Sequence, residues 1–185
     1  MKKRVQKHID KQDYVKIYIS DTDGSHITHF NGFIFEQNSK FLFLSETHDF
    51  MYDGAVVLRK KDISEIKRTE NEKFIQKILE KEGLKKAFYE RYQQLDFHLD
   101  SFENMFRNIQ KKQIPITLEA RYGKDDRFLI GPVAACTDKQ VKINYFNSYG
   151  EFDLKLVPCK YKEITHFCID SPYANLFYKY AKKVK

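Results

Sequence analysis

Residues 20–32, SDTDGSHITHFNG, bring two aspartates, a serine and two histidines into a short span. Carboxylate, hydroxyl and imidazole groups at such spacing are ligands for a divalent cation, which makes Asp21, Asp23, Ser25 and His26 candidates for a metal site. A calcium-binding loop is excluded, because Gly24 follows Asp23 directly and its last position carries a glycine instead of a glutamate. The other interpretation is a turn closed by a glycine.

Other residues that could carry catalysis lack partners in the sequence. His48 and Asp49 are adjacent, and adjacent residues of a strand point apart. His98 lies between Leu95 and Leu99 without a second histidine at helical spacing. The chain has no glycine-rich phosphate loop, no HExxH motif and no nucleophile elbow. We therefore predict no catalytic residue, no cofactor and no metal, and expect that the protein is not an enzyme.

The three cysteines, Cys136, Cys159 and Cys168, include no CxxC pair, so neither a disulfide framework nor structural zinc is expected. No apolar run reaches the roughly 18 residues of a membrane span, and no membrane partner is expected. The basic start, MKKRVQKHIDKQ, is not followed by the apolar stretch of a secretory signal. These features predict a cytoplasmic protein.

The net charge is +7, and the excess gathers at the two ends and in the run Arg59, Lys60, Lys61 followed by Lys67 and Arg68. A cationic surface of this kind favours nucleic acid or another anionic partner. Lysine-rich ends that only keep a small protein in solution are the competing interpretation.

The chain matches itself at an offset of 99 residues, with 14–45 over 114–144, Gly24 over Gly123 and Gly32 over Gly131. After the loss of one residue, SEIK at 64–67 meets KEIT at 162–165. Both glycine pairs and the phase of the apolar positions agree together, which indicates a repeated element. The segment SDTDG then lies over EARYG, which has no matching histidine or aspartate pair. The repeat therefore favours a turn over a metal site at residues 20–32.

Each copy reads as five short strands broken by turns. We place them near 14–20, 26–36, 40–46, 54–60 and 63–67, and near 114–121, 127–136, 139–146, 151–157 and 162–168. Five antiparallel strands in so short a stretch, with a glycine in a long second strand, are typical of a small barrel that bends at Gly32 and at Gly131.

The segment between the copies has helical periodicity. One apolar stripe recurs at steps of four and three: Phe88, Tyr92, Leu95, Leu99, Phe102, Phe106 and Ile109. A shorter helix is expected near 70–82, ending at Gly83, and another begins with Ser171 as N-cap and Pro172 as first residue.

The predicted fold class is α+β, mostly β: two tandem five-stranded SH3-like or Sm-like barrels joined by a long amphipathic helix. The predicted domains are 13–83 (first barrel and short helix), 84–112 (connecting helix) and 113–185 (second barrel and C-terminal helix).

Residues 14–67 resemble the Sm-like family (LSm, Hfq-type), and residues 114–168 do so more faintly. VKIYISDTDGSHITHFNGFIFEQNSKFLFLSE is similar to the first Sm motif, and AVVLRKKDISEI is similar to the second. The family binds RNA through the turn after its second strand and the turn between its fourth and fifth strands.

The resemblance places the nucleic-acid-binding residues at Asn38 and Lys40 in the first turn and at Arg59, Lys60 and Lys61 in the second. Lys40 stands where Hfq-type proteins stack a base on an aromatic ring, so phosphate contact is implied and base stacking is not. In the second copy the corresponding stretches are Cys136–Lys139 and Pro158–Lys160, also without an aromatic residue.

The sequence leaves two functions open. The first is a non-catalytic module that binds RNA through its basic surface. The second is a protein-interaction or assembly module that self-associates through barrel edge strands or through the 88–109 helix.

Overall fold

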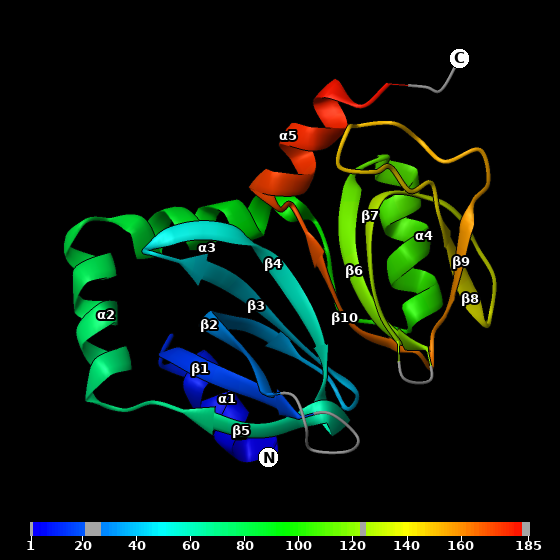
Figure 1. The fold of residues 1–185 in the computed structure, drawn as a ribbon. Helices are drawn as coiled ribbons and strands as arrows, with labels where there is room; N and C mark the ends of the chain where they lie inside the picture. The colour runs from blue at the N-terminus through cyan, green and yellow to red at the C-terminus, as the bar shows by residue number, and fades with distance from the viewer. Residues whose placement is uncertain (1, 21–26, 123–124, 183–185) are drawn as a thin grey trace. The chain divides into compact units, whose positions relative to one another are not determined.

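The computed structural model describes residues 2–20, 27–122 and 125–182 (Figure 1). The chain divides into two compact units, Met1–Leu99 (unit 1) and Asp100–Lys185 (unit 2). Their boundary falls inside the segment for which the sequence predicts one connecting helix.

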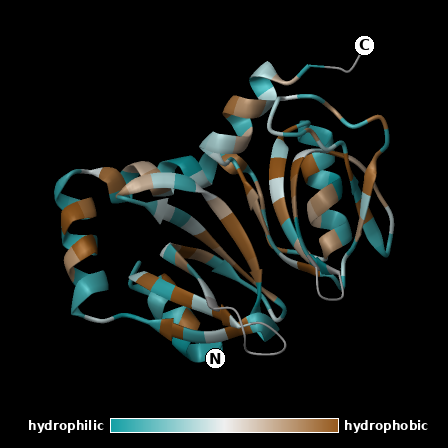
Figure 2. Ribbon diagram, in the orientation of Figure 1, coloured by the Kyte–Doolittle hydropathy of each residue, from teal (hydrophilic) through white to brown (hydrophobic). Residues whose placement is uncertain are grey.

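Unit 1 contains five antiparallel strands in the order β5-β1-β2-β3-β4. They are β1 (Tyr14–Ser20), β2 (Ile27–Gln37), β3 (Phe41–His48), β4 (Met51–Arg59) and β5 (Ile63–Lys67), with a 3₁₀ turn, η1 (Lys60–Asp62), before the last. The buried side chains along β3 and β4, among them Phe43, Leu44, Val56 and Leu58, belong to the core of this unit. Figure 2 shows hydrophobic and hydrophilic bands along these strands.

Unit 2 repeats this order as β10-β6-β7-β8-β9. Its strands are β6 (Pro115–Tyr122), β7 (Asp125–Cys136), β8 (Gln140–Ile143), β9 (Val157–Lys160) and β10 (Ile164–Ile169). In both units the fifth strand therefore pairs with the first, and the other strands follow in chain order.

The predicted pair of closed barrels is wrong. The strands follow one another in an open antiparallel order, and within the described part of either unit no ladder joins the first strand of that order to the last. Alternating apolar residues specify which face of a strand is buried, but they do not specify whether a sheet closes on itself.

A glycine occupies the same place in each unit. Gly32 of β2 pairs with Val15, and Gly131 of β7 pairs with Ile116. A Cβ atom on Gly32 would lie 1.6 Å from the carbonyl oxygen of Ser45, and one on Gly131 would lie 2.1 Å from that of Asn144. Only glycine allows this approach of two backbones.

The second strand of each unit has a register shift just beyond its glycine. The shift lies between Ile34 and Glu36 in β2 and between Val133 and Ala135 in β7. A bulge at this place bends the strand. The sequence prediction of a bend near Gly32 and Gly131 agrees with these positions, whereas Gly24 and Gly123 lie outside the described residues.

The predicted offset is wrong for the first strand, where it was 99, and for the last strand, where it was 98 after the loss of one residue. Gly32 to Gly131 keeps it, but the residues paired with them, Val15 and Ile116, differ by 101. In the last strands Ile66 pairs with Ile17 as Phe167 pairs with Leu118, an offset of 101, whereas the match of SEIK to KEIT has an offset of 98. The error of two residues in the first strand keeps every side chain on its predicted face, so the apolar pattern does not reveal it. The error of three residues in the last strand exchanges the two faces, and it stays hidden because every residue of β10 is buried.

The prediction of a single long connecting helix is also wrong. The structure has α3 (Leu84–Leu95) and α4 (Phe102–Lys112), separated by Asp96 with φ 45° and by Ser101, whose side chain accepts from Asn104 N. Asp favours turns and Ser favours N-caps, so these residues end one helix and begin the next although the apolar periodicity continues across them.

The apolar stripe that the sequence placed on one helix packs partly on strands of unit 1 and partly on strands of unit 2. Tyr92 of α3 stacks on Phe35 with ring centroids 4.2 Å apart. Phe106 of α4 lies 4.8 Å from Phe167 of β10. Phe88 is therefore a core residue of unit 1, and Phe106 and Ile109 are core residues of unit 2, whereas Leu95, Leu99 and Phe102 at the centre of the stripe are only partly buried.

The remaining helices are α1 (Lys2–Asp10), α2 (Glu70–Lys81) and α5 (Pro172–Tyr180). The structure confirms the short helix before Gly83 and the start of α5 at Ser171 and Pro172, whereas the sequence analysis did not predict α1. Thr69 and Glu72 form a capping box on α2, which explains why a local pattern predicts this helix.

Asp13 anchors α1 and the segment before α2 to the start of β1. Its carboxylate lies 2.8 Å from His8 Nδ1 and 3.1 Å from Arg68 Nε. Gln76 of α2 accepts from Tyr14 N at 2.8 Å. These contacts fix α1, which carries part of the basic surface described below.

The strand predicted at 151–157 is wrong. β9 begins only at Val157, and Leu154, which the alternation would bury, is 89% exposed. The segment before β9 instead packs Phe146 and Phe152 against Phe177 and Tyr178 of α5. Alternation over a few residues is also produced by a loop with two anchoring aromatics.

Replacing Gly32 with Ala is expected to destabilise unit 1 by at least about 3 kcal/mol, since backbone and not a flexible side chain blocks the new methyl group. Gly83→Ala is the control. Gly83 has φ 73° and open space around it, so this substitution should lower the stability of unit 1 by only about 1 kcal/mol. Urea unfolding of both variants measures this, and equal losses contradict the proposed role of Gly32.

His166 of β10 should make the stability of unit 2 depend on pH. Burial, with a contribution from Arg121, lowers its pKa from 6.5 to about 4, while Thr165 Oγ1 and Glu119 Oε1 lie 3.2 and 3.7 Å from its ring nitrogens. The folded state thus keeps a neutral imidazole while the unfolded chain takes up a proton near pH 6.5. The stabilisation is present above pH 6.5 and is lost as the pH falls toward 4, by roughly 3 kcal/mol in total.

Urea unfolding between these pH values tests this expectation. His166→Gln should reduce the pH dependence, because glutamine does not titrate. His98→Gln, at a side chain that is 78% exposed, should leave it unchanged. Identical pH profiles for the wild type and His166→Gln contradict the assignment.

Candidate nucleic-acid interface

The two turns of unit 1 that the sequence selects lie side by side. The turn between β2 and β3 closes with Asn38 N donating to Phe41 O at 3.1 Å. The η1 turn joins it through Lys60 N, which donates to Lys40 O at 2.8 Å. The five predicted site residues, Asn38, Lys40, Arg59, Lys60 and Lys61, are therefore brought together.

Asn38 shapes the turn. Its Oδ1 accepts hydrogen bonds from Lys40 N and Phe41 N, each at 2.8 Å. An asparagine that bonds to the backbone two and three residues ahead holds a turn without any ligand. A structural role thus accounts for this residue.

Arg59 and Lys60 are engaged inside the protein. Arg59 Nε pairs with Asp62 Oδ2 at 2.5 Å, and both side chains are largely buried. Lys60 Nζ donates to Gln37 Oε1 at 2.5 Å and to Asn38 O at 2.7 Å. Burial, together with the nearby charge of Lys2, lowers the pKa of Lys60. These two cations support the turns instead of standing free at the surface.

Lys40 and Lys61 remain exposed, and neither has an ion pair within the described ranges. The N-terminal helix adds a third exposed lysine, because Gln37 Nε2 donates to Lys2 O at 3.1 Å and to Gln6 Oε1 at 3.0 Å. Lys3 and Lys7 are exposed on the same helix. The basic surface of unit 1, defined here as Lys2, Lys40 and Lys61, thus combines α1 with both turns.

In unit 2 an aromatic residue replaces the buried lysine. Tyr161 N donates to Lys139 O at 3.0 Å, as Lys60 N does to Lys40 O. Tyr161 Oη donates to Thr137 O at 2.7 Å, the counterpart of the bond from Lys60 to Asn38 O. Its ring stacks on Phe106 at 5.8 Å and 11°. Sequence matching missed this residue because it aligned Pro158–Lys160 with the second turn.

A shallow pocket of about 610 Å³ lies over these turns of unit 2, and its lining includes Tyr161 with Lys139, Lys160 and Lys162. Cys159 beside it is buried, and burial raises the pKa of its thiol to about 11. The thiol therefore stays protonated at neutral pH and is a poor nucleophile.

The candidate metal ligands of the segment 20–32 lie outside the described residues. They are Asp21, Asp23, Ser25 and His26. Elsewhere in the described ranges no three His, Cys, Asp or Glu residues gather as metal ligands would. His48 and Asp49, expected to point apart on a strand, lie at a turn with Nε2 and Oδ2 3.6 Å apart and both side chains exposed.

Within the described part of the chain, no helix combines the length and the apolar character needed to cross a bilayer. Comparison with known protein families, with curated proteins and with solved structures finds no match to this chain.

Replacing Lys60 with Met is expected to lower the stability of unit 1 by about 1–2 kcal/mol, because it removes two charge-assisted hydrogen bonds and leaves Asn38 O without its donor. Lys61→Met should change stability by less than about 0.5 kcal/mol, as is usual for an exposed side chain. Urea unfolding compares the two, and equal effects contradict the different roles given to these lysines.

Proposed function

We propose that the chain is a non-catalytic module that binds RNA through the basic surface of unit 1. The observation that carries the proposal is that both turns meet α1. This meeting gathers the exposed Lys2, Lys40 and Lys61 around the partly buried, hydrogen-bonded ammonium of Lys60. The formal charge of +7 supports an anionic partner. The resemblance to the Sm-like family, whose RNA contacts come from these two turns, supports the same choice.

The contacts are of the phosphate type. Lysine ammonium groups act as point charges that recognise phosphate without reading bases. Lys40, and not an aromatic residue, occupies the position in the first turn at which Hfq-type proteins stack a base. Binding by this surface should therefore depend steeply on salt and weakly on sequence.

An assembly module is the second candidate, and α5 of unit 2 favours it. Tyr173, Leu176 and Tyr180 lie on one face of this helix and are 51%, 60% and 66% exposed. Apolar residues that share an exposed helix face suit a protein partner. Edge pairing through β9 is less favourable, because Pro158 lacks a backbone N–H.

The proposal predicts the salt dependence of binding to a labelled single-stranded RNA, measured by fluorescence anisotropy from about 50 mM to 200 mM salt. Replacing Lys40 and Lys61 together with Ala should flatten the log–log slope by roughly 1.4, at about 0.7 for each lost contact. Lys60 is kept because it holds the turns. Stability should be nearly unchanged, since both lysines are exposed.

The control variant replaces Lys77 and Lys81, two exposed lysines of α2, with Ala. It removes the same charge from another surface and should keep the wild-type slope. Absence of binding at about 50 mM salt, or equal slopes for the two double variants, rejects the RNA role. A concentration-dependent mass in light scattering would then favour assembly.

A further inference from the structure

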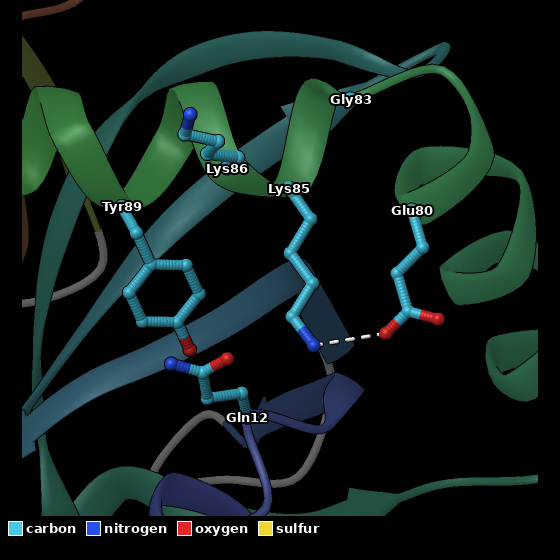
Figure 3. A pocket seen from close by; sticks show the side chains of 6 residues that line it. All are labelled: Gln12, Glu80, Gly83, Lys85, Lys86 and Tyr89. Carbon is cyan, nitrogen blue, oxygen red and sulfur yellow. Dashed lines mark hydrogen bonds and ion pairs between the residues drawn. The ribbon is translucent and has the colours of Figure 1, made fainter.

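A pocket of about 320 Å³ lies within unit 1, apart from the residues of the basic surface. Gln12 just beyond α1, Glu80 of α2, Gly83 of the connecting turn and Lys85, Lys86 and Tyr89 of α3 line it (Figure 3). Its volume is at the lower end of the roughly 300–1,000 Å³ that is typical of small-molecule sites.

Tyr89 directs a buried hydroxyl into this pocket. Its ring packs on Phe35 at 5.2 Å and on Phe33 at 5.8 Å, which fixes its orientation. The hydroxyl oxygen is buried and has no hydrogen-bond partner among the described residues. Burial, with a smaller effect of Asp13, raises the pKa of Tyr89, so this hydroxyl is a donor at neutral pH. Buried hydroxyls in proteins nearly always have a partner.

Lys85 supplies a second donor. Its side chain is only 17% exposed, and Nζ donates to Glu80 Oε1 at 2.9 Å. An ammonium has three N–H groups, and Glu80 takes one of them. The same carboxylate accepts from Gln76 Nε2 at 2.9 Å, which leaves it well satisfied. In Figure 3 the ammonium of Lys85 and the hydroxyl of Tyr89 extend from α3 into one space, with the carboxamide of Gln12 across it.

The hydrogen-bond donors of the lining favour a ligand group that accepts. Lys85 keeps N–H groups beyond its bond to Glu80, and the hydroxyl of Tyr89 has no partner among the described residues. Lys86 adds no unpaired charge, because its ammonium is exposed and pairs with Glu90 at 3.6 Å. Gly83, the N-cap residue of α3, has no side chain to cap the helix, and the pocket lies beside this first turn. A ligand oxygen between Tyr89 and Lys85 would meet donors from both.

We propose that this pocket binds a small molecule through an oxyanion head group, a carboxylate or a phosphate, whose oxygens accept hydrogen bonds from Tyr89 Oη and Lys85 Nζ. Gln12 offers a further donor and an acceptor to the remainder of the ligand. The site is independent of the proposed RNA surface, because none of Lys2, Lys40 and Lys61 lines it.

The test titrates inorganic phosphate and, separately, acetate into the protein of residues 1–185, with the backbone amide signals of Gly83, Lys85 and Lys86 followed by NMR. Both probes are minimal head groups, so affinities near the millimolar range are expected. Shifts with phosphate alone assign a phosphate ligand, and shifts with acetate alone assign a carboxylate. Saturable shifts with either one support the site.

Tyr89→Phe removes only the hydroxyl and should weaken binding by about tenfold or more, the factor expected for a hydrogen bond to a charged group. It should fold normally, because the lost group has no partner among the described residues. Tyr92→Phe is the matched control. Tyr92 lies on the same helix and stacks on Phe35, but it does not line the pocket, and its variant should bind as the wild type does.

Lys85→Met keeps an unbranched side chain beside the ring of Phe33 and should also abolish the shifts. The Lys40 and Lys61 double variant should leave them intact, which separates this site from the RNA proposal. Absence of saturable shifts with both probes, or equal affinity for the wild type and Tyr89→Phe, overturns the proposal and leaves the hydroxyl to an ordered water.

Discussion

The close contact between a glycine and the backbone of the next strand is the constraint on which both units depend. At Gly32 no side chain fits against the carbonyl of Ser45 in β3, and at Gly131 none fits against that of Asn144, directly after β8. A register shift follows at once, and the second strand bends there. The turn at the end of this strand then meets the turn before the fifth strand, as the bond from Lys60 N to Lys40 O records.

The two units use one backbone arrangement to present different chemistry. A carbonyl of the first turn accepts from Lys60 Nζ in unit 1 and from Tyr161 Oη in unit 2. The ammonium places a charge beneath an exposed cationic surface. The phenol instead joins the aromatic stack of α4 through Phe106. A change of one side chain at a shared position thus exchanges an ammonium for an aromatic ring beneath the two turns, while lysines surround the turns in both units.

Local patterns in the sequence predicted most of the strands and three helix ends. The alternation in β1 and β6 depends only on which face is buried, so these strands were placed well although their alignment was wrong by two residues. Ser171 and Pro172 fix a helix start through a bond to nearby backbone and through φ, and they were readable for that reason, whereas the cap of α2 by Thr69 appeared only in the structure. The exposed Leu154 shows where alternation without burial misleads.

The sequence by itself determined the type of most elements, their buried faces and the clustering of positive charge near residues 59–61, because these depend on residues close in the chain. The tertiary structure decided that the sheets stay open, that the apolar stripe divides at Asp96, and that Arg59 and Lys60 are engaged while Lys40 and Lys61 are exposed. It also placed Gln12 across a pocket from Tyr89. The engagement of Lys60 with Gln37 and the placement of Gln12 opposite Tyr89 depend on partners far apart in the chain, and local periodicity does not encode such pairings. The break at Asp96 is a local effect, which the continuing apolar periodicity concealed.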